Sequence, residues 1–221
     1  MKDFSVSMAL VDYIPVVFFA VAAVILMRDL YNKMSKGAFA LFAAGTINVT
    51  CAGALKATYK FLYALGVCDF EALNAMFFPV QSIGFLLAGV GMLAMVAFRQ
   101  TKPTVYSNAL IMAPVVAAEV AETQVAPAVF SGTFLFVGLM VAGLGIMDVV
   151  LCILAAKLKK PALIALFVVS FVCSLGMGYL SSQDFAQASM NWIAEGVNVV
   201  GQGTLLLGVW LMHKNELAEL Q

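Results

Sequence analysis

Long apolar stretches separated by short polar segments run along the whole chain. A helix that crosses a bilayer needs about 20 mostly apolar residues, and seven stretches reach that length. The expected spans are residues 11–30, 37–64, 72–98, 104–126, 130–156, 161–180 and 190–212. Pro15 is placed in the first turn of its helix, where proline is tolerated, whereas Pro79 and Pro114 are expected to bend theirs.

The composition supports a membrane protein. Hydrophobic residues make up 63% of the chain and charged residues 11%, compared with roughly 45–50% and 25% in a soluble domain. We therefore expect an all-α integral membrane protein that forms one transmembrane domain over residues 1–221. The start lacks the pattern of a cleaved signal peptide, so the first apolar segment is expected to remain.

Charge decides how the fourth stretch is interpreted. Residues 104–126 contain Pro114, Glu119 and Glu122, so hydropathy alone also fits a re-entrant or surface helix. Lys and Arg collect in cytoplasmic loops. Seven spans with the N-terminus outside and the C-terminus inside place nearly all basic residues on one side. These residues are Arg28, Lys33, Lys36, Arg99, Lys102, Lys157, Lys159, Lys160 and Lys214.

The first three and last three spans echo each other. Lys36-Gly-Ala-Phe-Ala-Leu-Phe parallels Lys160-Pro-Ala-Leu-Ile-Ala-Leu-Phe, and both Gln81 and Gln202 precede leucine-rich and glycine-containing runs. The pattern predicts a parallel repeat of three helices, residues 11–98 and 130–213, linked by 104–126. This 3+1+3 plan resembles in outline the SWEET sugar carriers, the PnuC vitamin transporters and, more loosely, opsins. No diagnostic motif accompanies it: the Pro-Gln dipeptide of PQ-loop carriers is absent, and the last span has no lysine for a retinal Schiff base.

A polar stripe marks the last span. Asn191, Glu195, Asn198 and Gln202 are spaced four, three and four residues apart, which places them on one helical face. A polar face in lipid is costly, so it is expected to face protein or water. One interpretation is a hydrogen-bonded seam between helices. The other is a wall of a path for a solute or an ion.

Further polar residues are expected at the same depth in the membrane as this stripe. Lys56, Glu119 and Glu195 each fall roughly 9–12 Å below the outer surface at 1.5 Å per residue, and Gln81 lies at a similar depth. A pair between Lys56 and either carboxylate would offset the cost of burying charge. The alternative is that Lys56 reaches up to the surface and Glu119 lines a wet rim with Glu122.

The predicted site is a polar cavity in the outer half of the bundle. Glu195 is its expected charged ligand, and a carboxylate left without a cation could carry a proton for coupling. The expected hydrogen-bonding partners are Asn191, Asn198, Gln202 and Gln81. Asp148, in the inner half, is expected either to pair with Lys157 or a loop lysine or to act as an inner gate.

The favoured function is a plasma-membrane (bacterial inner-membrane) transporter for a small cationic or zwitterionic solute. A seven-helix receptor that binds a small ligand is the first alternative, and an intramembrane enzyme using Glu119 and Glu195 is the second. No cofactor, metal or disulfide framework is expected, because His213 is the only histidine and the four cysteines lack metal-ligand spacing. Expected partners are the lipid bilayer and a small polar solute or ion. A homo-oligomer is left open, and zero net charge gives no reason to expect nucleic acid.

Overall fold

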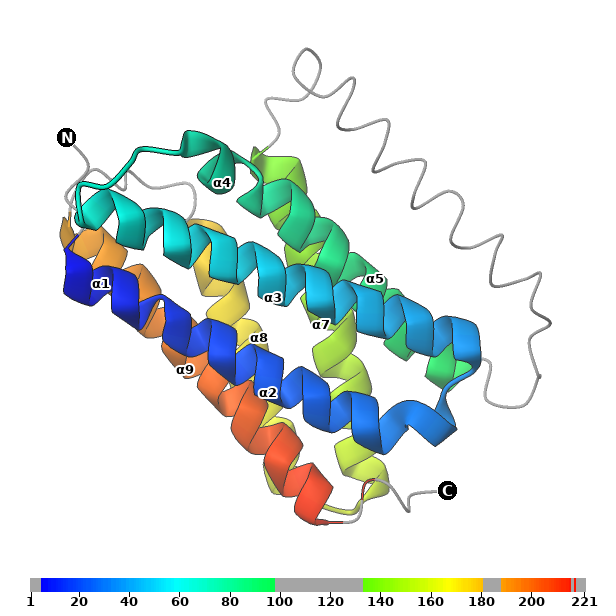
Figure 1. Ribbon diagram of the computed structural model, residues 1–221. Coiled ribbons are helices and arrows are strands. Elements are labelled where there is room, and N and C mark those ends of the chain that lie inside the picture. Colours follow the sequence, from blue (N-terminus) through cyan, green and yellow to red (C-terminus); the bar gives the residue numbers. More distant parts are fainter. Residues whose placement is uncertain (1–4, 98–132, 181–187, 216, 218–221) are drawn as a thin grey trace.

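The computed structural model describes residues 5–97, 133–180, 188–215 and 217, and this part of the chain is helical without a strand (Figure 1). The helices follow the apolar stretches closely. They are α1 (Val6–Val11), α2 (Tyr13–Leu30), the 3-10 turn η1 (Tyr31–Lys33), α3 (Lys36–Ala64), α4 (Glu71–Ala75), α5 (Phe77–Ala97), α7 (Thr133–Lys157), α8 (Pro161–Leu180) and α9 (Ala188–Lys214).

Within the described residues, five helical segments are long and apolar enough to cross a membrane: Val6–Lys33, Lys36–Ala64, Glu71–Ala97, Leu135–Lys157 and Pro161–Leu180. Large apolar side chains such as Val17, Val24 and Val172 are more than half exposed on the outside of the bundle, as expected of a surface that faces lipid. The chain is thus a multi-pass membrane protein. The 27-residue helix α9 is not among the five, because its polar stripe offsets the aliphatic residues between its members.

In the part of the chain that the structure describes, six long helices form a ring: each packs against the next of the six, and α9 packs back against α2. The ring consists of two trios of helices, α2, α3, α5 and α7, α8, α9, and neighbouring helices within each trio are antiparallel. Across the closing contact, Phe18 lies beside Gly203 and Asp29 contacts His213, so α2 and α9 run parallel. Following the directions around the ring, α2, α5, α7 and α9 point one way and α3 and α8 the other.

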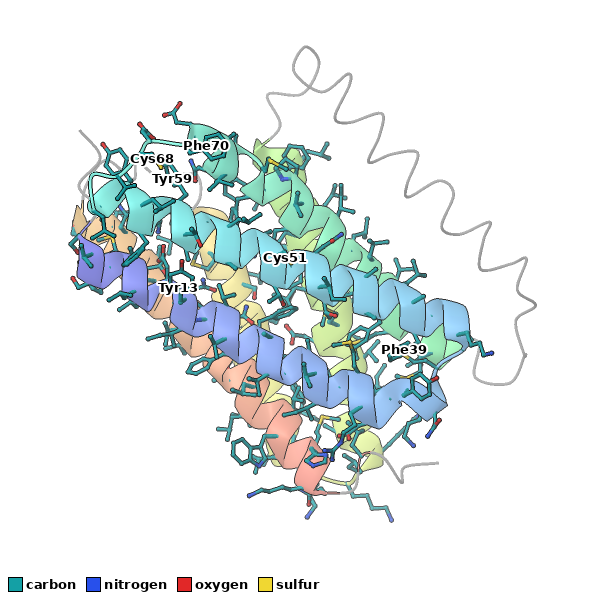
Figure 2. All side chains as sticks on the ribbon, in the orientation of Figure 1. Tyr13, Phe39, Cys51, Tyr59, Cys68 and Phe70 are labelled. Carbon is teal, nitrogen blue, oxygen red and sulfur yellow. The ribbon has the colours of Figure 1, made fainter. Side chains whose placement is uncertain are left out.

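The bundle has two distinct ends. We call them the α4 end, where α1 and α4 lie and α9 begins, and the η1 end, where α2, α5 and α9 finish (Figure 1). In Figure 2, Tyr59, Cys68 and Phe70 mark the α4 end and Phe39 lies towards the η1 end. Basic residues of the described part gather at the η1 end: Arg28, Lys33, Lys36, Lys157, Lys159, Lys160 and Lys214.

The helices on either side of the fourth predicted span run in the same direction. Ala97, the last residue of α5, therefore lies at the η1 end, and Thr133, the first of α7, at the α4 end. The predicted span itself, residues 104–126, lies outside the described residues.

Two prolines interrupt helices at the α4 end. Proline has no N–H, and its ring clashes with the carbonyl four residues earlier. Pro15 thus separates α1, which ends at Val11, from α2, and Pro79 separates α4, which ends at Ala75, from α5. The bend expected at Pro79 is present as a break between two helices. Pro15 is the third residue of α2, so its placement in the first turn of that helix is confirmed, although a short helix, α1, precedes the break.

Glycines allow α3, α5 and α7 to pack with their backbones in contact. A β-carbon on Gly143 would lie 2.4 Å from the carbonyl carbon of Phe85, and one on Gly89 would lie 2.5 Å from the carbonyl oxygen of Gly143. A β-carbon on Gly45 would meet the backbone of Gly84 and Ala88 at 2.4 Å. Such approaches are typical of small residues at helix interfaces in membranes.

We predict that Gly143→Ala destabilises the protein, because the added methyl group must displace the backbone of α5. Overpacking of this kind costs about 1–3 kcal/mol or more. Gly138→Ala, on the same helix, is the matched control, since no atom lies within 4 Å of its β-carbon position. Thermal unfolding of both purified variants in detergent measures the difference, and equal melting temperatures would contradict the close α5–α7 contact.

Candidate functional site

A polar cavity lies between α2, α3, α5 and α9 towards the α4 end. Its volume is about 60 Å³, which leaves room for roughly four to six waters at 10–15 Å³ each. Apolar side chains on its walls, among them Phe19, Val49 and Phe85, also belong to the hydrophobic core. The polar residues that line it are Asp12, Thr50, Lys56, Gln81, Glu195, Asn198 and Gln202.

Lys60 joins three helical elements beside this cavity. Its Nζ lies 2.6 Å from Oδ2 of Asp12 and 3.1 Å from Oε1 of Glu195, and all three residues are less than 9% exposed. Asp12 occupies the break between α1 and α2, Lys60 stands near the end of α3, and Glu195 lies in the second turn of α9. The bridge therefore fastens the α4 ends of these helices together.

Lys56 lies one turn before Lys60 on α3, nearer the η1 end, and contacts an aromatic ring. Its Nζ stands 3.9 Å from the centroid of the Phe77 ring, a cation–π contact of the usual geometry. It also lies within electrostatic range of Lys60, Glu195 and Asp12. Two lysines and two carboxylates thus face one small space, so their formal charges balance.

The amide side chains extend the cavity towards the middle of the bundle. Gln81 enters from α5, and Asn198 and Gln202 enter from the stripe face of α9. The Oε1 atom of Gln202 is buried and accepts no hydrogen bond from any described residue. Buried polar atoms are usually satisfied, so this oxygen is positioned to accept a hydrogen bond from a bound molecule or water.

Comparison with protein-family models, curated proteins and solved structures gives no match.

The structure brings together most of the residues singled out from the sequence. Glu195, Asn198, Gln202, Gln81 and Lys56 all line the cavity. Asn191 is buried one turn before Glu195 but does not line it. Glu119 lies outside the described residues. Lys56 was expected to pair with Glu119 or Glu195. Glu195 pairs with Lys60 instead, one turn closer to the α4 end, and the pair with Glu119 lies outside the described residues.

Sequence reasoning missed Asp12, Lys60 and Thr50. Asp12 is the second residue of the predicted span 11–30 and was expected near its outer end, because the helix Val6–Val11 before it was not predicted. Its signal was the position three residues before Pro15, within an apolar run that continues on both sides. Lys60 follows Lys56 by four residues, so both lysines lie on one helical face.

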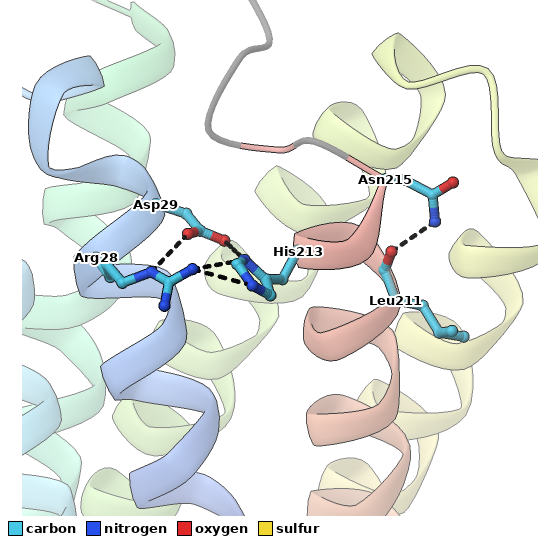
Figure 3. Close-up of polar contacts among 5 residues, drawn as sticks. All are labelled: Arg28, Asp29, Leu211, His213 and Asn215. Atoms are coloured by element: carbon cyan, nitrogen blue, oxygen red, sulfur yellow. Dashed lines mark hydrogen bonds and ion pairs between the residues drawn. The ribbon is translucent and has the colours of Figure 1, made fainter.

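A second polar cluster fastens α2 to α9 at the η1 end (Figure 3). His213 Nδ1 lies 2.9 Å from Oδ2 of the buried Asp29. Arg28 reaches both partners, with a terminal guanidinium nitrogen 3.0 Å from His213 Nε2 and its Nε 3.5 Å from Oδ1 of Asp29. The α2–α9 contact is thus held by polar groups at both ends.

Asp148 lies apart from both clusters, in the contact between α7 and α8. It is 2% exposed, and neither carboxyl oxygen has a hydrogen-bond partner among the described residues. The expected pair with Lys157 is not formed; Lys157 is exposed at the end of α7.

We predict that Lys60→Met strongly destabilises the protein, because it leaves Asp12 and Glu195 buried without their shared cation. Removing one partner of a buried pair costs about 3–5 kcal/mol. The triple variant Asp12→Asn, Lys60→Met, Glu195→Gln is expected to recover most of this loss, since no charge is then left uncompensated.

Thermal unfolding of the purified variants provides the measurement. Lys36→Met, at the η1 end and away from the cavity, controls for the loss of a lysine. A single Lys60→Met variant as stable as the triple variant would show that the bridge does not hold these helices.

Proposed function

We propose that the protein is a plasma-membrane (bacterial inner-membrane) carrier for a small zwitterionic solute. The observation that carries the proposal is the cavity in which side chains of both charges and several amides meet, surrounded by membrane-spanning helices. Ionisable residues inside a membrane bundle mark solute or ion paths more often than other residues do. The cluster draws on α2, α3 and α9, with Gln81 added from α5, as expected of a site at a junction between helices.

The charge balance favours a zwitterion over a simple cation. Lys60 already lies between Asp12 and Glu195, so a lone cation would compete with a lysine for both carboxylates. A zwitterion can offer its ammonium group to Glu195 and its anionic group to Lys56, leaving the sum of charges unchanged. Asn198 and Gln202 would orient its remaining polar atoms.

The size of the cavity limits the solute. A volume of about 60 Å³ is small beside the roughly 300–1,000 Å³ typical of drug-sized ligand pockets. A solute with few non-hydrogen atoms, of the size of the smallest amino acids or betaines, fits this space best.

The surroundings of the cavity suit alternating access. Towards the η1 end, the rings of Phe19 and Phe85 meet edge to face at 5.4 Å between centroids and separate the cavity from the core beyond. Towards the α4 end, the helix breaks before Pro15 and Pro79 supply points where short segments can reorient. Interrupted helices line the substrate sites of many transporters.

Orientation and architecture follow from charge and direction. The basic η1 end is proposed to be cytoplasmic, which places the cavity in the outer half. The trios α2, α3, α5 and α7, α8, α9 share the same sequence of directions. We infer from this that they form the parallel repeat predicted from the sequence, within a seven-span fold that includes residues 104–126.

We predict that Glu195→Gln lowers uptake of the transported solute by about tenfold or more, because the ammonium group loses its charged ligand. A thermal-stability screen of small amino acids, betaines and polyamines with the wild-type protein selects the solute. Uptake of that radiolabelled compound into proteoliposomes then measures transport.

Glu71→Gln, on α4 and outside the cavity, is the matched control and is expected to transport normally. Stabilisation by a compound without uptake would replace the carrier with a ligand-binding receptor. A preference for polyamines over zwitterions would contradict the proposed solute class.

A further inference from the structure

Asp148 is a carboxyl group that the solute cavity does not use. It faces α8 from a position between Gly145, which packs against Phe171, and Cys152, whose sulfur lies 4.0 Å from the carbonyl oxygen of Ile164. The side chain that faces it across this contact is Ser170, near the middle of the 20-residue helix α8. Asp148 thus lies close to mid-depth in the bundle.

Among the described residues, no cation faces Asp148 from the helices packed against α7. The sequences of α5 and α8 contain no Asp, Glu, Lys, Arg or His residue. The titratable groups nearest its level are the thiol of Cys152, one turn along α7, and that of Cys173 on α8. On α9, Glu195 lies nearer the α4 end, paired with Lys60, and His213 is at the η1 end with Asp29.

Three buried side chains with hydrogen-bonding oxygens lie at the same level. Both oxygens of Asp148, the hydroxyl of Ser170 and Oε1 of Gln202 have no well-formed hydrogen bond within the described part of the chain. The helices that carry them adjoin: a β-carbon on Gly201, the residue before Gln202, would lie 3.8 Å from the carbonyl oxygen of Ser170. Ser170 therefore stands between Asp148 and the helix that lines the cavity.

We propose that Asp148 and Ser170 form a buried proton-binding site at mid-depth in the bundle. An ionised carboxylate in an apolar interior needs a cation or several donors, and Asp148 faces one hydroxyl. A proton on one carboxyl oxygen removes the charge. The resulting O–H group can donate a hydrogen bond to the hydroxyl oxygen of Ser170. Among the described residues no group of three His, Cys, Asp or Glu side chains surrounds it, so a multidentate metal site is disfavoured.

The proton exchanges with water when the α7–α8 contact opens. It arrives from hydronium on one side of the membrane, binds an Asp148 oxygen, and leaves to water on the other side, so charge moves without any other reactant. Coupling of this exchange to solute movement rests on the proposed carrier function; the proton site itself does not. This assigns the coupling proton to Asp148 rather than to Glu195, whose charge Lys60 already compensates.

Infrared titration of the reconstituted protein tests the site without any solute. The wild-type protein is expected to show a carbonyl band of a protonated carboxylic acid that disappears on alkalisation. Asp148→Asn should abolish this band, whereas Glu195→Gln should leave it. Ser170→Ala should shift the pH at which the band disappears, an effect that a purely structural role for the hydroxyl would not produce.

Transport in proteoliposomes tests the coupling. With the solute identified, an imposed pH gradient should drive its uptake by the wild-type protein. The Asp148→Asn protein should lose gradient-driven uptake by about tenfold or more. It should retain exchange of external for internal solute, because the neutral amide matches the protonated carboxyl in shape and charge.

The outcomes separate the two proposals. Absence of uptake of any solute by the wild-type protein would refute the carrier and leave the infrared result standing. A protonated-carboxyl band that persists in Asp148→Asn would overturn the proton site. A second result would also overturn the proton site. The wild-type protein would show no such band, and sodium would raise its melting temperature but not that of Asp148→Asn, because the carboxylate would then bind a metal cation.

Discussion

The contact on which the α4 half of the structure depends is the ammonium group of Lys60 between two buried carboxylates. One carboxylate comes from the break between α1 and α2, and the other comes from α9. Because the charges are out of water, loss of Lys60 would leave two buried carboxylates without their shared cation. The bridge fixes where the α1–α2 break lies relative to α9, and with it the wall that the cavity shares with the polar stripe.

The balance of charge in this region also shapes its chemistry. A cluster with equal numbers of lysines and carboxylates exerts little net attraction on a lone ion but offers complementary contacts to a molecule with both signs. Asp148 differs in being buried with no counter-charge in the described part of the chain, and we therefore propose a proton rather than a solute as its ligand. The surroundings of each carboxyl group therefore determine which ligand we propose for it.

Much of the helical architecture was readable from the sequence. The predicted span 161–180 coincides with α8, and 37–64 differs from α3 by one residue, because long apolar runs are bounded by clear signals such as the capping Ser35 and Pro161. The stripe on α9 identified cavity residues because helical periodicity fixes which side chains share a face. The partner of Glu195 was not predictable: Lys56 and Lys60 share one face, and the choice depends on the depth of Asp12. That depth follows from the break before Pro15, which a local pattern does not reveal.

The two places where the trios of the ring meet are built differently. At α5 and α7, Gly89 and Gly143 bring the two main chains into direct contact, so a change of side-chain rotamers cannot separate these helices. At α2 and α9, the contact is fastened by polar groups at either end, which water can replace one at a time. If the two trios move relative to each other, we therefore expect the α5–α7 contact to stay closed and the α2–α9 contact, which carries the polar stripe, to be the one that yields.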